Sequence, residues 1–505
     1  MVDVDASSSG ASLEVDQKPV QQWDENAEKK VGVTDTDDAP AFDEGQTRKL
    51  LRKMDRHLVP FLAVLYLLSF LDRTNIGNAR LFGLEADLGM EGLDYNIALA
   101  VFFPPYVAAE IPSNMMMKRY RPSIWLTIIM VAWGLCVTFM GFVNNLTGLI
   151  IARVFLGICE GGLFPGVTYY ITLWYRRHEC GYRMAVFFSA ATAAGAFGGL
   201  LARGIGSMDG VGGKAGWAWI FILEGLLTLA VASVAWWAIN DYPSTAKFLT
   251  AEEKVEVARR LKADRNSLAD EFDVKYFWDA LKDWKIYGHM LITIGIYTPL
   301  YSISLFLPTI IRTMGNGQYS PETSQLLSVP PYVVGCVFTI GAGLYADKLK
   351  QRGIFMLTFE AVAIIGWVLL ISSDKPANQY IGTFFCVSGI YPLVPLGVAW
   401  NGNNIGGSLK RGVGIAMHVG FGNLGGVIAS FMYMTKDSPR FLPGHGTLIG
   451  LISMSFVVTL IMTTYLRREN ARRDREYTSP ELYTEEQKLA ERDRGDYASF
   501  YRYTI

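Results

Sequence analysis

Four ionisable side chains interrupt long apolar stretches of the sequence. Asp72 and Arg73 end the run "LYLLSFLDR", and Arg153 and Glu160 lie in "RVFLGICEGG". The planar guanidinium of arginine binds a carboxylate through two parallel hydrogen bonds, and a carboxyl group beside it can carry a proton. These residue types therefore predict a site that binds a small carboxylate together with a proton.

The apolar surroundings make an incidental placement of these four residues costly. Each charge in mid-span costs roughly 2.5–3.5 kcal/mol, so we expect all four side chains to converge inside a helical bundle rather than face lipid. Arg153 and Glu160 share one face of a helix, about 10 Å apart. A buried salt-bridge network that only fixes helix packing is the structural alternative.

The elements that position these residues are predicted membrane spans. The chain has 505 residues, of which 51% are hydrophobic and 18% charged, with a mean hydropathy of +0.22. A bilayer is crossed by a helix of about 20 apolar residues, because lipid offers the backbone no hydrogen-bond partners. Twelve such stretches lie at 58–77, 97–117, 123–143, 147–172, 184–205, 217–239, 286–311, 325–346, 354–372, 379–401, 411–434 and 447–466. They are too long for core helices of a soluble enzyme and lack the alternation of a membrane barrel.

The predicted fold class is an all-α membrane protein with twelve transmembrane helices in two six-helix bundles. The bundles are expected at 56–240 and 286–468, joined by a cytoplasmic linker at 241–285. Residues 1–55 are predicted to form a disordered acidic tail, and residues 469–505 a second tail. Lys and Arg crowd the loops on one side of the spans, so both termini are expected in the cytoplasm.

Charge and motif content exclude several function classes. The formal net charge is −1, which gives no electrostatic case for nucleic acid. The sequence has no Walker loop, no dinucleotide-binding glycine motif opening a soluble helix and no metal-ligand spacing. We therefore expect no cofactor, no metal and no enzymatic activity. The expected partners are a small organic anion, a proton and the lipid bilayer, for a protein that acts as a monomer.

Motifs along most of the chain carry a resemblance to a known family. They are "LDRTNIGNA", "EIPSNMMMKR", "RVFLGICEGGLFPG", "WAWIFILEG", "LFLP" and "WNGNNIGGSLKR". With these motifs the chain resembles the major facilitator superfamily and, within it, is similar to the fungal anion:cation symporters of the allantoate permease family. The resemblance implies proton symport of small organic anions such as allantoate, nicotinate, pantothenate or biotin, with the plasma membrane as the expected location.

The same resemblance implies roles for particular residues. It places the first and fourth spans around a central cavity and extends to Arg73 an arginine that binds the anion. The segment "GLYADKLKQRG" corresponds to the superfamily's cytoplasmic signature, so Asp347, Lys348 and Arg352 are expected to act in gating. In the first half, Lys118 occupies the position at which the signature has its aspartate. A contact other than the usual charge pair must therefore close the cytoplasmic gate on that side.

A coupling hypothesis follows from the charges. A carboxylate held ionised by an arginine, either Glu160 or Asp72, loses that partner when an incoming anion captures the arginine. The released carboxylate then takes up a proton, because burial without a cation disfavours its charge. Anion and proton would bind together, which is symport.

Further substrate contacts are predicted at Arg153, Asn404, Asn423 and Tyr301. Amide and tyrosine side chains also pack between helices, so a purely structural role for them stays open. Other polar groups in or near the spans are weaker candidates for substrate or proton contacts, with structural roles as the alternative: Asn403, Tyr297, Glu110, Glu224, Glu360 and His418.

Two other functions stay open at the level of sequence. An exporter of an acidic secondary metabolite would use the same fold and charges, and only the direction of flux under a proton gradient separates it from an importer. A nutrient sensor that binds the anion without transporting it is the second alternative.

Overall fold

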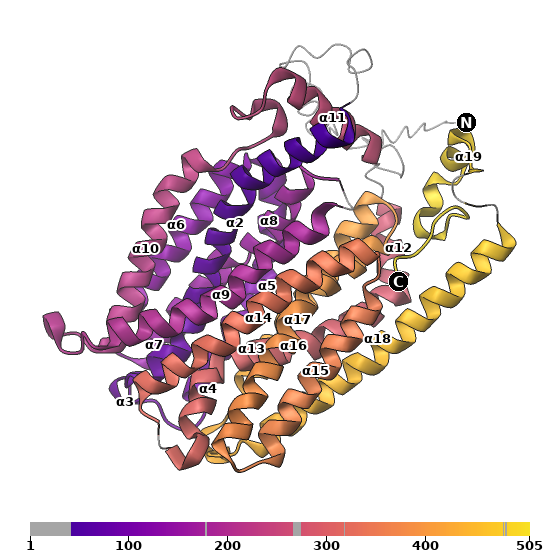
Figure 1. Ribbon diagram of the computed structural model, residues 1–505. Coiled ribbons are helices and arrows are strands. Elements are labelled where there is room, and N and C mark those ends of the chain that lie inside the picture. Colours follow the sequence, from indigo (N-terminus) through magenta and orange to yellow (C-terminus); the bar gives the residue numbers. More distant parts are fainter. Residues whose placement is uncertain (1–41, 177–178, 266–273, 318, 478, 480–481) are drawn as a thin grey trace, which may run out of the picture.

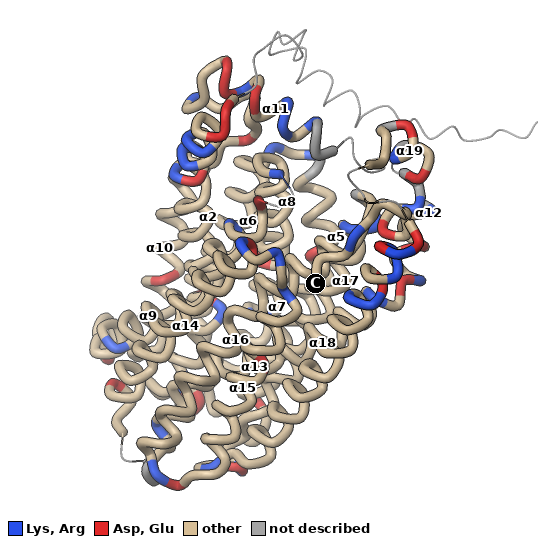
Figure 2. Tube along the Cα trace, turned by 45° about the vertical axis from the view of Figure 1, so that its right-hand side comes forward, with Lys and Arg blue, Asp and Glu red and all other residues tan. Residues whose placement is uncertain are grey.

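The computed structural model describes residues 42–176, 179–265, 274–317, 319–477, 479 and 482–505. Every regular element of that part of the chain is a helix, and the long helices run side by side in one bundle (Figure 1). Eleven of its helices are long and apolar enough to cross a membrane. Charged residues gather near the ends of the bundle, and few lie along the length between them (Figure 2). The predicted fold class, an all-α multi-pass membrane protein, is therefore confirmed.

The two halves of the chain contribute similar sets of helices. The first half contains α2 (Glu44–Leu81), α3 (Leu84–Asp87), α4 (Asp94–Ala100), α5 (Phe103–Arg119), α6 (Pro122–Met140), α7 (Leu146–Glu160), α8 (Leu163–Thr172), α9 (Cys180–Gly206) and α10 (Gly216–Ala238). The connection and the second half contain α11 (Ala251–Arg265), α12 (Val274–Lys282), α13 (Trp284–Gly317), α14 (Pro321–Leu349), α15 (Gly353–Ser372), α16 (Pro376–Asn403), α17 (Ser408–Ser430), α18 (Leu442–Glu476) and α19 (Glu485–Ala490). Short 3-10 turns at 211–213, 243–245, 435–437 and 492–497 complete the described elements.

Two of the predicted spans are broken helices. The span at 97–117 divides into α4 and α5. Proline lies in the first turn of α5, where its lack of an N–H is tolerated because the N–H groups of a first turn have no partner within the helix. The span at 147–172 divides at Gly161, where a Cβ would collide with the backbone oxygen of Tyr106 on α5. The break lets α7 approach α5 closely and places Glu160 at the last position of α7.

The first helix begins earlier than the sequence indicates. Residues 44–55, predicted as part of a disordered tail, form the first turns of α2, and this corrects the boundary. Asp43 caps the helix, since its side chain accepts from the Gln46 N–H while the Gln46 side chain accepts from the Asp43 N–H. Lys53 then pairs with Glu253 of α11 over 2.7 Å. Residues 1–41 lie outside the described part of the chain.

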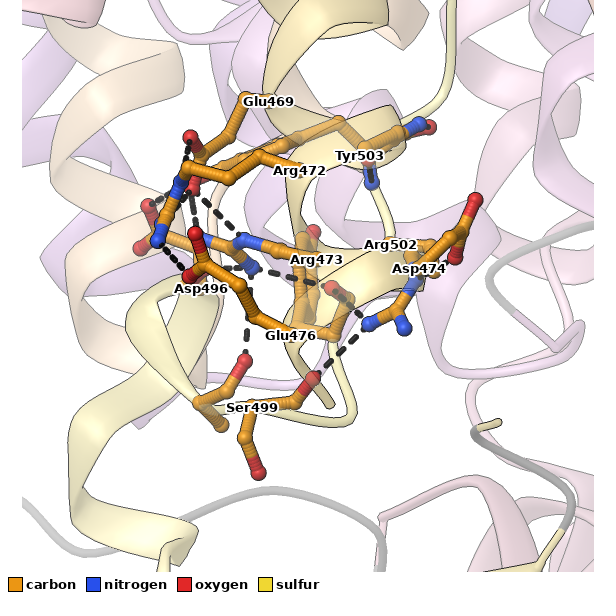
Figure 3. A network of polar contacts seen from close by, with 12 residues as sticks. Glu469, Arg472, Arg473, Asp474, Glu476, Asp496, Ser499, Arg502 and Tyr503 are labelled. Atoms are coloured by element: carbon orange, nitrogen blue, oxygen red, sulfur yellow. Dashed lines mark hydrogen bonds and ion pairs between the residues drawn. The ribbon is translucent and has the colours of Figure 1, made fainter. Parts of the chain in front are cut away.

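The C-terminal segment is packed rather than free. Helix α18 continues to Glu476, beyond the predicted end of the second bundle at 468. Arg473 on this helix donates to the backbone oxygens of Asp496, Ala498 and Tyr501 over 3.0, 3.3 and 2.9 Å, and also to Glu469 over 2.8 Å (Figure 3). One buried guanidinium thus holds three backbone oxygens, which fixes the path of residues 496–501.

The side chain of Asp496 anchors this segment to the second half. Its carboxylate is fully buried and pairs with Lys285 and Lys410, and Asp283 also pairs with Lys410. Burial acts to raise the pKa of Asp496, but the two lysines outweigh it and hold the pKa below its ordinary value. We call the end of the bundle that carries α11, α12 and this segment the terminus face (Figure 1).

Candidate functional site

A buried ion pair occupies the centre of the first half. Arg73 on α2 donates to Glu160 on α7 over 2.5 Å, and the two side chains are 3% and 0% exposed. Ser69 lies one turn before Arg73 and donates to the same carboxylate oxygen over 2.5 Å. Of the two acids that the coupling hypothesis left open, Glu160 is the one that pairs with Arg73 in this structure.

Arg73 also reaches the second half of the chain. It donates to the hydroxyl of Tyr301 on α13 over 3.0 Å, and Tyr301 donates to Asn423 on α17 over 2.7 Å. The amide of Asn423 donates in turn to Glu110 on α5 over 2.6 Å. This continuous network, from Glu160 through Arg73, Tyr301 and Asn423 to Glu110, crosses between the halves twice.

Aromatic rings surround the guanidinium of Arg73. Its central carbon lies 4.7 Å from the ring centre of Tyr106, 5.2 Å from that of Phe102 and 5.8 Å from that of Tyr301. Cation–π contacts of this kind stabilise a desolvated guanidinium by up to about 2 kcal/mol. The rings therefore stabilise the guanidinium of Arg73 in this position.

Two polar atoms of the ion pair retain unused hydrogen-bonding capacity. Within the described residues, Nε of Arg73 and Oε2 of Glu160 are buried and make no hydrogen bond. Buried polar atoms are nearly always satisfied, so these two atoms have the capacity to bind a further partner, such as a water molecule or a ligand. A ligand carboxylate at the free edge of Arg73 would satisfy this donor.

The structure corrects the expected convergence of the four charged residues for Asp72. Arg153 does lie beside the Arg73 site, since its central carbon is 4.9 Å from the ring centre of Phe102, the ring that also contacts Arg73. Asp72 points away from the ion pair and accepts hydrogen bonds from Trp133 and Thr228 over 3.1 and 3.0 Å. Arg153 is fully buried and donates to the backbone oxygens of residues 98 and 99 over 3.3 and 3.5 Å. Neighbouring positions on α2 point in different directions, which explains why Asp72 and Arg73 separate.

Asn404 lies at a different place from the ion pair. Its amide forms two hydrogen bonds with the backbone of Thr504, over 2.8 and 3.0 Å, and so binds the C-terminal segment. The nearby Asn403 accepts a bond from Tyr501 through its backbone oxygen. These contacts give both asparagines a part in holding that segment and leave Asn423 as the amide in the central network.

The predicted gating residues meet the first half at the terminus face. Arg352 pairs with Asp347 over 2.5 Å, and a Cβ at Gly181 of α9 would lie 2.7 Å from an atom of each. The backbone N–H of Arg352 donates to the backbone oxygen of Ile505 over 2.6 Å. Lys348 is exposed, so the close approach between the halves involves Asp347 and Arg352 instead. The side chain of Lys118 lies outside the described part of the structure.

Hydrogen bonds also join the halves at the opposite end of the bundle. Asn96 donates to the backbone oxygen of Ser430 over 2.5 Å, and Gln325 donates to Asn78 over 3.1 Å. With contacts between the halves at both ends, the central network lies in a closed conformation.

The remaining polar candidates have local partners on neighbouring helices. Glu224 accepts from Asn75, Glu360 accepts from Ser455 and Thr459, and His418 contacts Thr293 over 2.6 Å, while Tyr297 is buried with its ring 6.2 Å from that of Tyr301. Ser69, Phe102 and Tyr106 are not among the site residues predicted from the sequence. The spacing of Ser69 and Arg73, one turn apart, is the one available signal for Ser69.

Sequence comparison connects the chain with membrane transporters. Residues 62–430 match the family described as Major Facilitator Superfamily. An uncharacterized transporter of Schizosaccharomyces pombe is 35% identical over 436 residues, which cover 86% of this chain and 89% of that protein. MFS-type transporter cnsO of Penicillium expansum is 34% identical, with 87% and 89% covered. Major facilitator-type transporter hxnP of Emericella nidulans is 31% identical, with 85% and 88% covered.

Solved structures share the fold at low sequence identity. The partially occluded inward-open conformation of the xylose transporter XylE from E. coli aligns with a TM-score of 0.61 and 14% identity, covering 81% of this chain and 97% of that one. A bacterial homologue of the human lysosomal transporter Spinster, inward-facing and occupied, aligns with a TM-score of 0.57 and 12% identity, covering 81% and 95%. At this identity the likeness concerns the fold alone.

Proposed function

Because this chain belongs to the major facilitator superfamily and is a membrane transporter rather than an enzyme, we propose that it is a proton-coupled symporter of a small organic anion. The proposed substrates are carboxylates of the size of a vitamin or a nitrogenous acid, such as nicotinate, pantothenate or allantoate. The proposed site of action is the plasma membrane, with both termini in the cytoplasm.

The observation that carries this proposal is that Arg73 makes hydrogen bonds to both halves of the chain. The guanidinium binds Glu160 of the first half and Tyr301 of the second, and its Nε is unbonded within the described residues. An anion that binds Arg73 would therefore compete with Glu160 and contact the second half at the same time. Binding and closure of the halves would then be linked.

Proton coupling follows from the loss of this ion pair. When a substrate carboxylate takes over the guanidinium, Glu160 is left buried without its cation. A buried carboxylate without a partner is strongly destabilised, so it takes up a proton. The site then holds anion and proton together with no added net charge, which lowers the cost of moving both past the apolar interior.

Release reverses these steps on the other side of the membrane. Opening admits water, which solvates the substrate carboxylate and the protonated Glu160. Glu160 loses its proton, pairs again with Arg73 and displaces the anion. Glu160 and the substrate carboxylate thus compete for one guanidinium, and Arg73 binds only one of them at a time.

Transport by purified protein in proteoliposomes tests the proposal. Labelled nicotinate, pantothenate, biotin and allantoate would be offered at an outside pH of 5 or 7.5, with and without a protonophore. The expected result is accumulation of at least one anion at pH 5 that the protonophore abolishes. Uptake of none of these anions, or uptake that ignores the proton gradient, would contradict the proposal. Efflux driven by the gradient would identify an exporter instead.

A further inference from the structure

A line of buried polar side chains runs along α13, from the central network to the terminus face. They recur at every fourth position, so neighbouring members lie about 5–6 Å apart on the helix. Each is at most 4% exposed. We call these five residues the polar column: Lys285, His289, Thr293, Tyr297 and Tyr301. Polar groups inside a membrane span are costly, so a line of five indicates a use beyond helix packing.

Helix α17 packs against this column. A Cβ at Gly422 of α17 would lie 2.8 Å from the ring of Tyr297, which shows how closely the two helices approach there. One turn further along α13, the hydroxyl of Thr293 lies 2.6 Å from Nδ1 of His418. The polar groups of the column therefore lie inside the contact between α13 and α17 rather than against lipid.

The side chain of His289 has no hydrogen-bond partner among the described residues. Both of its ring nitrogens are buried and unbonded, and the residue is 1% exposed. Its ring packs edge-on against Trp400 of α16, with the ring centres 4.9 Å apart, and the ring centre of His418 is 6.1 Å away. A neutral imidazole has one N–H donor and one acceptor nitrogen. His289 therefore has both a donor and an acceptor free for water or a proton.

The titratable side chains that act on His289 are His418 of α17 and Lys285 of α13, while α16 presents the uncharged Trp400. Lys285 lies one turn from His289 and pairs with Asp496 and, over 3.5 Å, with Asp283.

Lys410 of α17 pairs with the same two carboxylates, over 2.7 Å each. Two lysines therefore balance two aspartates, so this end of the column is close to neutral and does not repel a proton strongly.

A cavity connects this charge cluster with the surface at the terminus face. Asp283 and Lys410 line it, and its volume is about 390 Å³. Exposed residues, among them Lys282 and Tyr497, line the same cavity. A polar cavity of this size has room and partners for several water molecules. The column therefore ends close to water.

We propose that the polar column conducts the coupled proton between the central network and the water at the terminus face, with His289 and His418 as the groups that carry it. The inference rests on the proton coupling proposed above. A proton that Glu160 gives up to water would bind one ring nitrogen of His418, whose other nitrogen releases a proton towards His289.

His289 would accept this proton on one nitrogen and release another to the water beside Lys285. Each imidazole thus accepts one proton and gives one up, so neither stays charged in the interior. The proton would leave inside the second half, by a route separate from that of the anion bound to Arg73.

Uptake into proteoliposomes, with a pH-sensitive dye inside to follow protons, tests this inference on the purified full-length protein. The probes are nicotinate, pantothenate, biotin and allantoate, and the one that the wild type accumulates is used throughout. His289→Phe keeps a ring against Trp400 but has no nitrogen to carry a proton. His445→Phe is the matched control, since His445 is a buried histidine of α18 outside the column.

The expected result is a selective loss of proton-driven transport. His289→Phe should slow gradient-driven uptake and the accompanying proton flux at least about tenfold, because a positioned acid–base group speeds proton transfer by about 10²–10⁴-fold. Counterflow of the labelled anion needs no net proton movement and should stay within about twofold of the wild type. The control should change both rates less than about twofold.

Rescue by free imidazole separates proton conduction from a structural role. His289→Ala leaves a space that imidazole can fill, and the restored ring nitrogens should recover at least about a third of the wild-type proton flux. Imidazole should not rescue His289→Phe, because the phenyl ring fills that space. The phenylalanine variant also corrects for any effect of imidazole on the pH gradient itself.

The outcomes separate this inference from the proposed function. Normal gradient-driven uptake by His289→Phe, equal slowing of its counterflow, equal slowing by the His445 control or failure of imidazole to rescue His289→Ala would each overturn the column as a proton route and leave symport in place. A wild type that accumulates none of the four anions, or whose uptake ignores the proton gradient, would overturn the proposed function and this inference with it.

Discussion

The guanidinium of Arg73 in the first half of the chain lies 3.0 Å from the hydroxyl of Tyr301 in the second half. Alternating access in this fold requires the two halves to rock about a central site, so this hydrogen bond must break or change partners during transport. The ion pair with Glu160 keeps Arg73 on the first half when that happens. Under the proposed function, Arg73 would therefore carry a bound anion into contact with the second half.

Arg73→Lys is expected to abolish uptake while the protein still folds. Lysine keeps the positive charge that Glu160 requires but cannot bind two oxygens in parallel or stack between Phe102 and Tyr106. We expect transport efficiency to fall at least about 100-fold. Uptake into proteoliposomes measures the effect, and the gel-filtration profile checks folding. Arg203→Lys, an exposed position on α9, is the control, and normal uptake by the Arg73 variant would contradict the assignment.

Glu160→Gln separates substrate exchange from proton coupling. The amide keeps hydrogen-bonding capacity toward Ser69 and Arg73 but cannot release a proton. Counterflow of labelled substrate should remain within about threefold of the wild type, while accumulation driven by a pH gradient is lost. Accumulation that survives in this variant would exclude Glu160 as the coupling acid.

Asp72→Asn provides the comparison for that experiment. Among the described residues, no arginine pairs with Asp72. Its carboxylate accepts from Trp133 and Thr228, and an asparagine oxygen can accept the same bonds. We expect gradient-driven accumulation to persist in this variant. If Asp72→Asn loses accumulation while Glu160→Gln keeps it, Asp72 rather than Glu160 is the residue that binds the coupled proton.

The sequence predicts the spans well, and it predicts the burial of Arg73 and Glu160 inside the bundle, for a physical reason. Apolar length alone specifies a span, and the cost of burying Arg73 and Glu160 requires them to face inward. It predicts less well which inward-facing residues meet. Any hydrogen-bond partner lowers the cost of burying a polar side chain. Asp72 finds such partners on α6 and α10, and Asn404 finds one in the backbone of Thr504. Contacts between residues far apart in sequence depend on helix rotation and on chain breaks such as Gly161.

Gly181→Ala is expected to weaken closure at the terminus face. The added Cβ would lie 2.7 Å from atoms of Asp347 and Arg352, so their side chains must shift and the halves separate more readily. A cost of about 1 kcal/mol would raise the open population roughly fivefold. A cysteine at position 185, buried on the same helix, would report this as faster labelling by a maleimide once the native cysteines are replaced. Gly204→Ala is the control, because no atom lies within 4 Å of its Cβ, and equal labelling in the two variants would contradict the prediction.

Asp496→Asn is expected to release the C-terminal segment. The variant leaves Lys285 and Lys410 buried with one carboxylate fewer between them, which costs about 3 kcal/mol and reduces the docked population about 100-fold. Limited proteolysis of residues 482–505 measures docking. Asp474→Asn, at an exposed carboxylate that pairs with Arg502, is the matched control and should leave the protease pattern unchanged.

The same contact predicts how docking depends on pH. Because the pKa of Asp496 is lower in the folded protein, its contribution to stability is complete above the ordinary carboxyl value and is lost as the pH falls through the lower, folded value. Protection of the segment should therefore stay constant from pH 8 to pH 5 and decline below about pH 4, while Asp496→Asn should show no such decline because it lacks the titrating group. Protection that disappears between pH 7 and pH 5 in the wild type would place control of docking in a group other than Asp496, since the lysine partners keep their charge across that range.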